Sequence, residues 1–357
     1  MRCARAVGLL AISILIPAMR AAPASGKYAG TLVCEGCHAG QAKTQRLSAH
    51  AAALFRTQDH PLADSFTAGK ELSRPPAWRF TFFDIAGALQ ARIVDGKDVM
   101  ELPMEWAFGA GRQAVTFVTR VNKDLYVEHY ATWYTALQGW GATPGQAAIR
   151  PANMAQAAGI LYPISDPVTG VAGCFECHST GPVSFDREGN VSLGESGVHC
   201  EACHGPGAAH AAKPRTVKIT NPGSLSAGQL NQFCGRCHRL PAAPGAVTDW
   251  SYAWNIRHQP VYLNASACFE KSNGKLSCLT CHDPHESAGK KAVASYNNIC
   301  TNCHGTSAPS PKAVCREKEP ANCIDCHMPL VSPQAPLRYT NHRIGVYGDN
   351  AKLQPVR

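Results

Sequence analysis

The sequence Cys200-Glu201-Ala202-Cys203-His204 contains the five-residue unit, Cys-x-x-Cys-His, around which this chain is organised. The unit occurs seven times in 357 residues and uses 14 of the 17 cysteines. With 15 histidines in the whole chain, a histidine after each of seven cysteine pairs does not arise by chance. The seven copies are Cys34–His38, Cys174–His178, Cys200–His204, Cys234–His238, Cys278–His282, Cys300–His304 and Cys323–His327.

The histidine decides between three interpretations of the cysteine pairs. A zinc knuckle or a redox-active dithiol would explain Cys-x-x-Cys, but neither requires the residue that follows. Covalent haem attachment does require it, because two thiols add to the vinyl groups of one haem and the next imidazole reaches the iron. The sequence therefore predicts seven covalently bound haem c groups. The predicted attachment residues are Cys34, Cys37, Cys174, Cys177, Cys200, Cys203, Cys234, Cys237, Cys278, Cys281, Cys300, Cys303, Cys323 and Cys326.

The predicted iron ligands fall into two sets. The proximal set is His38, His178, His204, His238, His282, His304 and His327. The distal set, which would close the opposite faces, is His50, His199, His210, His258, His285 and His342. For each distal candidate a surface or structural histidine is the alternative. We expect His285 to serve a neighbouring haem, because it lies too close to His282 to reach the other face of the same one.

Two further histidines are predicted not to bind iron. His60 precedes a proline and is expected in a loop, while His129 lies in a strand-like run. Six distal candidates then serve seven haems, so one iron could keep an open position. That shortfall is what leaves room for an enzyme.

The N-terminus predicts export. Arg2 and Arg5 precede an apolar run from residue 6 to 19, and Ala22-Pro23-Ala24 resembles a cleavage site. We expect residues 1–24 to be a Sec signal peptide, which makes the mature chain periplasmic or otherwise exported, with no membrane span. Loss of this segment would take the formal charge from +9 to +6. Fourteen haem propionates would offset that charge, so we expect no nucleic-acid partner.

Composition and motif spacing predict the domains. Hydrophobic residues make up 45% of the chain and charged residues 17%, which excludes a disordered or collagen-like chain. The haem units predict a first-haem segment at 25–65 and a six-haem domain at 151–357. Between them, at 66–150, strand-like runs and turn residues predict a small antiparallel β module. The expected strands are Trp78–Phe83, Ala88–Val94, Ala114–Val121 and Leu125–Tyr134.

Two cysteines lie outside the haem units of the mature chain. Cys268 and Cys315 are 47 residues apart, and in an oxidising compartment we expect them to form a disulfide. A pair of free, buried thiols is the alternative.

Several motifs resemble one known superfamily. The stretch 197–207 with His210, the stretch 278–285, and the stretch 323–329 with the later 341–344 are similar to multihaem cytochromes of the cytochrome c-554 superfamily, which is linked to hydroxylamine oxidoreductase. The resemblance implies a mostly irregular fold with short α-helices around stacked haems. It also implies that His50, His210, His285 and His342 are distal ligands. The β-rich insert is absent from the small carrier of that superfamily.

The predicted function is electron transfer through closely spaced, mostly bis-histidine haems. The expected partners are redox proteins such as a membrane quinol oxidase or a terminal reductase. The competing hypothesis is a reductase or oxidase of a small nitrogen or sulfur compound, with substrate bound at an iron that has an open axial position. A subunit of a haem filament is a third class.

Overall fold

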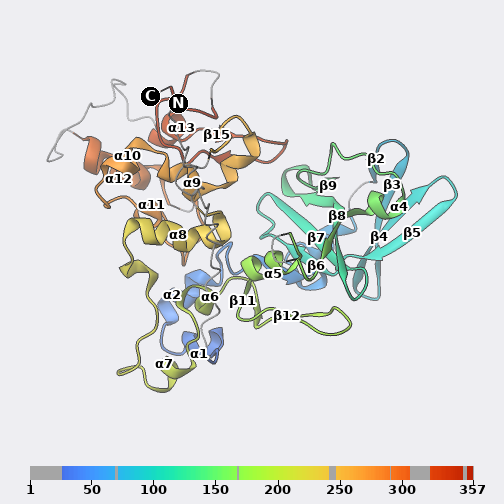
Figure 1. Cartoon of the computed structure of the whole chain (residues 1–357), viewed down its shortest axis with the longest axis horizontal. Helices are drawn as coiled ribbons and strands as arrows, with labels where there is room; N and C mark the ends of the chain where they lie inside the picture. Colours follow the sequence, from blue (N-terminus) through green and yellow to red (C-terminus); the bar gives the residue numbers. More distant parts are fainter. Residues whose placement is uncertain are drawn as a thin grey trace, which may run out of the picture.

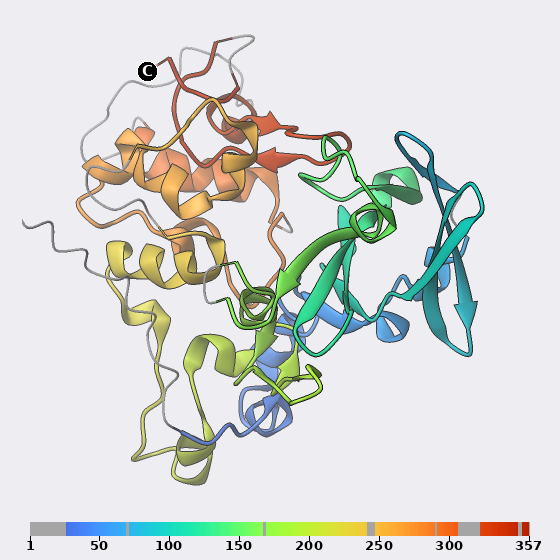
Figure 2. The same ribbon diagram turned by 45° about the vertical axis from the view of Figure 1, so that its right-hand side comes forward.

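The computed structural model describes residues 26–68, 71–166, 169–240, 247–289, 291–305, 322–348 and 352–356. Figure 1 shows two regions, a β-rich lobe on the right and a lobe of short helices and irregular chain on the left. Figure 2 shows the same separation after a 45° turn. The predicted signal peptide and Cys315, one partner of the predicted disulfide, lie outside the described residues.

The β-rich lobe contains two antiparallel sheets. The four-stranded sheet has the order β2-β3-β4-β5, and the other has the order β1-β6-β7-β8-β10, with β9 also paired to β8. The strands of the first sheet are β2 (Leu72–Arg74), β3 (Trp78–Ile85), β4 (Ala88–Asp95) and β5 (Asp98–Pro103). Those of the second are β1 (Leu54–Arg56), β6 (Trp106–Phe108), β7 (Ala114–Arg120), β8 (Leu125–Tyr134), β9 (Gly139–Ala142) and β10 (Gly159–Pro163).

The four expected strands therefore form β3, β4, β7 and β8. The turn between β3 and β4 is Ala86-Gly87, and both residues have positive φ, which fits the twist of a tight hairpin. The turn between β7 and β8 is held by the Asn122 side chain, which accepts hydrogen bonds from the backbone N–H of Asp124 and Leu125. The second sheet also takes in β1 and β10, which lie beyond residues 66–150.

The core of the β-rich lobe is aromatic. Phe66, Phe117 and Trp133 are at most 2% exposed, and Phe82 stacks on Trp140 at 3.7 Å between ring centroids. Alternation along β3, where Trp78, Phe80 and Phe82 are buried, turns one face of the sheet toward this cluster. This lobe closes around its own side chains.

The other lobe is built from short helices. Its helices, with those that flank the sheets, are α1 (Thr31–Glu35), α2 (Ala39–Gln45), α3 (Ala63–Phe66), α4 (Met154–Ala158), α5 (Ala172–His178), α6 (Cys200–His204), α7 (Ala208–Ala212), α8 (Ala227–His238), α9 (Gln259–Asn264), α10 (Ala267–Lys271), α11 (Cys278–Cys281), α12 (Val293–His304) and α13 (Cys323–His327). Single turns of 3₁₀ helix are η1 (Thr57–Asp59), η2 (Thr135–Leu137), η3 (Pro222–Ser224) and η4 (Ala253–Arg257). Two-residue strands pair as β11 (Ser179–Thr180) with β14 (Glu195–Ser196), β12 (Ser184–Phe185) with β13 (Val191–Ser192), and β15 (Leu330–Val331) with β16 (Tyr339–Thr340).

Most Cys-x-x-Cys-His units end a helix. In α5, α6, α8, α12 and α13 the motif histidine is the last helical residue. The local sequence explains some of the starts: a Ser226–Gln229 capping box begins α8, and the Asn322 side chain caps α13. One helical turn separates the paired cysteines, so both thiols lie on the same side of the helix.

A second apolar cluster joins the two lobes. Phe175 on α5 is fully buried against Trp106 and Phe108 of β6 and Tyr126 of β8. Because Phe175 lies between Cys174 and Cys177, this packing fixes one haem unit directly on the sheet.

The predicted fold class is confirmed: the chain is mostly irregular, with short helices and small antiparallel sheets. Within the described ranges, every helix is too short or too polar to cross a bilayer.

Candidate haem-binding cavity

Residues of all seven Cys-x-x-Cys-His units line one continuous cavity of about 5190 Å³. An ordinary small-molecule pocket measures about 300–1,000 Å³. The cavity is therefore large enough for several bulky cofactors, and its walls carry the thiols and imidazoles that covalent haem attachment requires. All six predicted distal histidines also line it: His50, His199, His210, His258, His285 and His342.

Four motif histidines face a second histidine across this cavity. The ring centroids are 6.5 Å apart for His38 and His210, 6.3 Å for His204 and His285, 6.2 Å for His282 and His342, and 6.1 Å for His238 and His50. Metal–nitrogen bonds of about 2 Å on opposite faces of one iron place two imidazole centroids about 6 Å apart. The observed spacings fit one iron between each pair.

The four pairings link distant parts of the chain. His50 follows the first unit but faces the fourth, and His285 follows the fifth but faces the third. The structure thus brings His285 to a neighbouring unit, the arrangement expected from its closeness to His282. His50 itself lies in turns beyond α2, which ends at Gln45.

Hydrogen bonds orient the cavity histidines. The Nδ1 atoms of six of them face backbone carbonyls, which can only accept, so each Nδ1 carries the proton and each Nε2 keeps its lone pair. That leaves Nε2 available to a metal, the usual arrangement of a ligating histidine. The six contacts are His50 to Pro284 (3.5 Å), His178 to Ala53 (3.1 Å), His204 to Thr220 (2.7 Å), His210 to Val217 (2.7 Å), His327 to Gly345 (2.8 Å) and His342 to Thr340 (2.9 Å).

Burial keeps several of these imidazoles neutral. It lowers the pKa of His178, His238, His258 and His282, and it lowers the pKa of His342 to about 4. A histidine binds metal only in its neutral form, so at neutral pH these side chains are ready to ligate.

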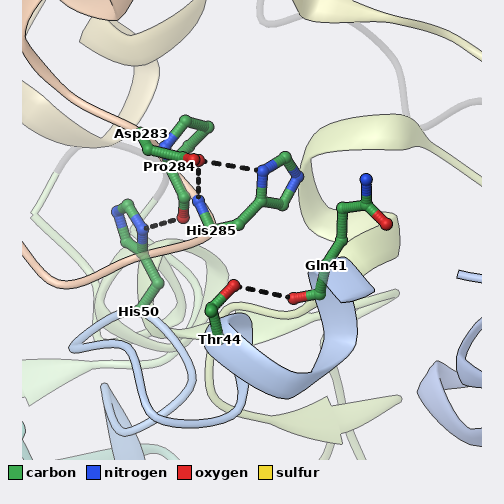
Figure 3. Close-up of polar contacts among 6 residues, drawn as sticks. All are labelled: Gln41, Thr44, His50, Asp283, Pro284 and His285. Atoms are coloured by element: carbon green, nitrogen blue, oxygen red, sulfur yellow. Dashed lines mark hydrogen bonds and ion pairs between the residues drawn. The ribbon is translucent and has the colours of Figure 1, made fainter. Parts of the chain in front are cut away.

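The segment Asp283-Pro284-His285 lies between two of the pairs. Figure 3 shows the Pro284 carbonyl facing His50 Nδ1 on one side of this turn, and the Asp283 carboxylate bonded to His285 on the other. His282, a predicted ligand of the fifth haem, directly precedes this turn. The four residues 282–285 therefore include two predicted ligands, His282 and His285, and contact a third, His50, and each of the three belongs to a different haem.

Cysteines of different units also lie together. The thiols of Cys34 and Cys200 interact, as do those of Cys177 and Cys237, Cys234 and Cys278, and Cys300 and Cys323. These contacts place the first unit beside the third, the second beside the fourth, the fourth beside the fifth, and the sixth beside the seventh. Spatial order therefore departs from sequence order among the first four units.

The remaining predicted ligands are less completely paired. Among the described residues, no second histidine ring stacks against His178, His304 or His327; His178 instead contacts the Phe108 ring. His258 is half-buried at the start of α9. His199 differs from the other distal candidates because its Nε2 donates a hydrogen bond to the Ser196 carbonyl. The lone pair that remains available to a metal is therefore on its buried Nδ1.

The two histidines predicted not to bind iron lie outside the cavity lining. His129 is buried in β8, where its Nε2 bonds the Thr119 hydroxyl at 2.8 Å and burial lowers its pKa to about 4. His60 lies in a bend between η1 and α3, in agreement with the predicted loop, and it is 3% exposed between Phe55 and Phe66. Its Nδ1 accepts from the Leu62 N–H, and its Nε2 faces the Gly109 carbonyl.

Sequence reasoning missed the carboxylates that brace the site. Glu201, between Cys200 and Cys203, is 3% exposed and accepts backbone N–H bonds from Ala29, Gly30 and Gly207 at 2.6–2.8 Å. Glu195 accepts two more bonds from Thr31, at the start of α1. These contacts fasten the first unit to the third, and no local sequence signal distinguishes such a glutamate from a solvent-facing one.

A polar group adjoins the second unit. Glu128 of β8 bonds Gln146 at 3.0 Å and interacts with Tyr162 and Arg257, and burial raises its pKa. Glu128 and Tyr162 also interact with Cys174, while Arg257 acts on His178. Within the described ranges, no three histidine, cysteine, aspartate or glutamate side chains converge as a metal-ion site.

Comparisons with known proteins agree with this donor set. Residues 135–205 match the family described as cytochrome c554 and c-prime, and residues 271–309 match the family described as doubled CXXCH motif. Over 177 residues the chain is 28% identical to the multiheme cytochrome MtrA of Shewanella baltica (strain OS185), covering 45% of this chain and 46% of that protein. The chain thus spans about half the length of this curated relative.

Two solved structures are similar in outline. The outer cell wall cytochrome OcwA gives a TM-score of 0.48 at 17% identity, covering 89% of this chain and 79% of that one. The undecaheme cytochrome from the S-layer of Carboxydothermus ferrireducens gives 0.43 at 18% identity, covering 86% and 51%. The repeated unit, the cavity that it lines and the sequence matches together support covalent haem c binding through CXXCH motifs, as in multihaem c-type cytochromes.

Proposed function

We propose that this protein carries electrons between redox partners through seven covalently bound haems, most of them held by two histidines. The observation that carries the proposal is the set of four histidine pairs spaced for one iron each. Bound haem supplies one-electron iron chemistry, and two fixed imidazoles let the iron change charge with little rearrangement. The contacts among cysteines of different units support close spacing along a continuous path.

The haem count and the ligation have separate tests. The intact mass of the purified protein should exceed its polypeptide mass by seven haems, and a smaller excess would refute the count. Electron paramagnetic resonance of the oxidised protein should be dominated by low-spin iron. A spectrum in which most iron is high-spin would overturn bis-histidine ligation.

A matched pair of variants sharpens the ligand test. Burial lowers the pKa of both His342 and His129 to about 4, but only His342 lines the cavity. We expect His342→Ala to convert one haem to high spin and His129→Ala to convert none. Equal spectra for the two variants would contradict the assignment of His342 as a ligand.

The sequence supports a proposal for the location and the partners. The N-terminal 24 residues act as a cleaved Sec signal, so the protein works in the periplasm or beyond it, without a membrane span. Its partners are redox proteins, such as a membrane quinol oxidase or a terminal reductase, and no nucleic acid is involved. Cell fractionation with N-terminal sequencing tests this proposal, and uncleaved protein in the cytoplasm would refute it. The link to hydroxylamine oxidoreductase and the Cys268–Cys315 disulfide remain predictions.

One observation favours a second candidate function, a reductase or oxidase of a small nitrogen or sulfur compound. His178 has no paired histidine ring among the described residues, and Glu128, Tyr162 and Arg257 gather beside its unit. An acid, a hydroxyl and a guanidinium are groups that deliver protons and bind anions. Cyanide binding to one haem per molecule, with viologen-driven turnover of nitrite or hydroxylamine that Glu128→Gln reduces, would establish it. If neither cyanide binding nor turnover is detected, electron transfer is the remaining proposed function.

A further inference from the structure

One cavity histidine, His285, has a carboxylate as the hydrogen-bond partner of its Nδ1. Asp283 Oδ1 accepts two bonds from His285, one from its backbone N–H at 2.9 Å and one from Nδ1 at 3.0 Å (Figure 3). The six other Nδ1 contacts described above all end on neutral backbone carbonyls. Asp283 is therefore a carboxylate held in place on the back of one predicted iron ligand.

A carboxylate acts on a ligating imidazole more strongly than a carbonyl does. Hydrogen bonds to an ionised acceptor are roughly twice as strong as those between neutral groups. Drawing the Nδ1 proton toward a full negative charge makes Nε2 a better electron donor, which favours the more positive iron state. The effect of such a contact is a lower reduction potential at that iron.

The effect should be confined to one haem. The Asp283 and His285 side chains are 46% and 36% exposed, so water and salt screen the carboxylate from more distant irons. The hydrogen bond itself acts on His285 alone, and His285 faces His204 of the third unit at 6.3 Å.

We propose that Asp283 lowers the reduction potential of the haem between His204 and His285. The inference rests on the proposed function, because it takes His285 as an iron ligand. The potential of this haem matters because its unit lies between two others. The Cys200 thiol interacts with Cys34 of the first unit, and the Cys203 thiol interacts with Cys234 of the fourth unit. A lower potential at this unit would slow electron transfer between the first and fourth units by way of it, without changing the equilibrium between the haems on either side.

The test is a spectroscopically resolved redox titration of the holoprotein. Asp283→Asn keeps the shape of the side chain and an acceptor oxygen but removes the charge. We expect the reduction equilibrium of one haem to shift about tenfold toward the reduced state, which is about 59 mV for a one-electron couple. Asp283→Glu keeps the charge, so it should shift the reduction potential of that haem less than Asp283→Asn does.

Two further variants identify the haem and control for charge. His285→Ala should convert one low-spin signal to high spin, and the same signal must be the one that shifts in Asp283→Asn. Asp325→Asn removes a carboxylate of the seventh unit, which accepts a hydrogen bond from the Asn322 side chain and is not bonded to a histidine. It should leave that signal unchanged.

The outcomes separate this inference from the function on which it rests. If His285→Ala creates a high-spin haem but Asp283→Asn shifts nothing, or no more than Asp325→Asn, the inference is overturned and the carrier function stands. If His285→Ala leaves every haem low-spin, His285 is not a ligand, and both the inference and this histidine pairing fail.

Discussion

The two lobes hold themselves together by different means. In the β-rich lobe, side chains from β3, β4, β7 and β8 close a buried aromatic core. In the other lobe, α10, α11, α12 and α13 contain no buried residue, and the chain surrounds a cavity of about 5190 Å³. A polypeptide cannot maintain so large an apolar-walled cavity at native packing density. The comparison indicates that haem is the core of one lobe, while side chains are the core of the other.

The largest expected effect comes from withholding haem. When the chain is produced without haem attachment, we expect the described stretches within residues 196–345, here called the motif lobe, to lose their protection from protease, because their buried partner is missing. Strands β3 to β8 should keep their protection from protease. Limited proteolysis with mass spectrometry of the fragments measures both regions in one sample.

The fully loaded protein is the control for this experiment, and in it both regions should resist cleavage. Equal protection of the two lobes without haem would show that the motif lobe packs by itself. Equal loss from both would show that the sheets depend on the cofactor through the Phe175 contact with β6 and β8.

A substitution in the aromatic core should destabilise the β-rich lobe and leave the motif lobe unchanged. Phe117 is fully buried against Phe66 at 5.1 Å between ring centroids. Phe117→Ala should lower the free energy of local unfolding of β7 and β8 by about 3–5 kcal/mol, measured by hydrogen exchange. The haem absorption spectrum should not change. Val99→Ala, at a side chain 58% exposed, is the matched control and should change exchange little.

The sequence predicted the β-rich lobe well because its information is local. Period-two alternation and turn residues such as Asn122 act over a few positions, so the strand and turn positions followed directly. The haem units were equally local, since five consecutive residues carry the attachment chemistry.

Pairing between units could not be predicted in the same way. That His50 faces His238, or that Glu201 binds the backbone of Ala29, depends on chain segments more than 150 residues apart. Nothing in the neighbourhood of either residue encodes that contact. The burial of His60 was not predicted either, because the Gly109 carbonyl that its Nε2 faces reaches it only in the folded lobe.

Acid should weaken the β-rich lobe through one buried histidine. Burial lowers the pKa of His129 from 6.5 to about 4, so between these values the unfolded chain binds a proton that the folded chain does not. Stability is then complete above about pH 7 and is lost as pH falls through this window, by about 2 kcal/mol between pH 7 and 5. Hydrogen exchange in β8 at the two pH values measures it.

The non-titrating variant His129→Gln isolates this contribution. Between pH 7 and 5, the variant should lose about 2 kcal/mol less stability than the wild type. The neighbouring Glu128, whose pKa burial raises, remains in both proteins and cancels in the difference. Parallel pH profiles would contradict the role of His129.

The smallest expected effect tests whether surface charge contributes to the same lobe. Arg92 and Glu101 are directly opposed on β4 and β5, with 2.7 Å between Nε and Oε1, and both side chains are more than 40% exposed. Solvent screening limits such a pair to about 0.2–1 kcal/mol, and a double-mutant cycle of Arg92→Ala and Glu101→Ala measures the coupling in β4 and β5. A coupling of several kcal/mol would mean that the sheet is held by its surface as much as by its aromatic core. A value below about 1 kcal/mol leaves burial as the dominant source of stability, which is the property that the motif lobe can acquire only from haem.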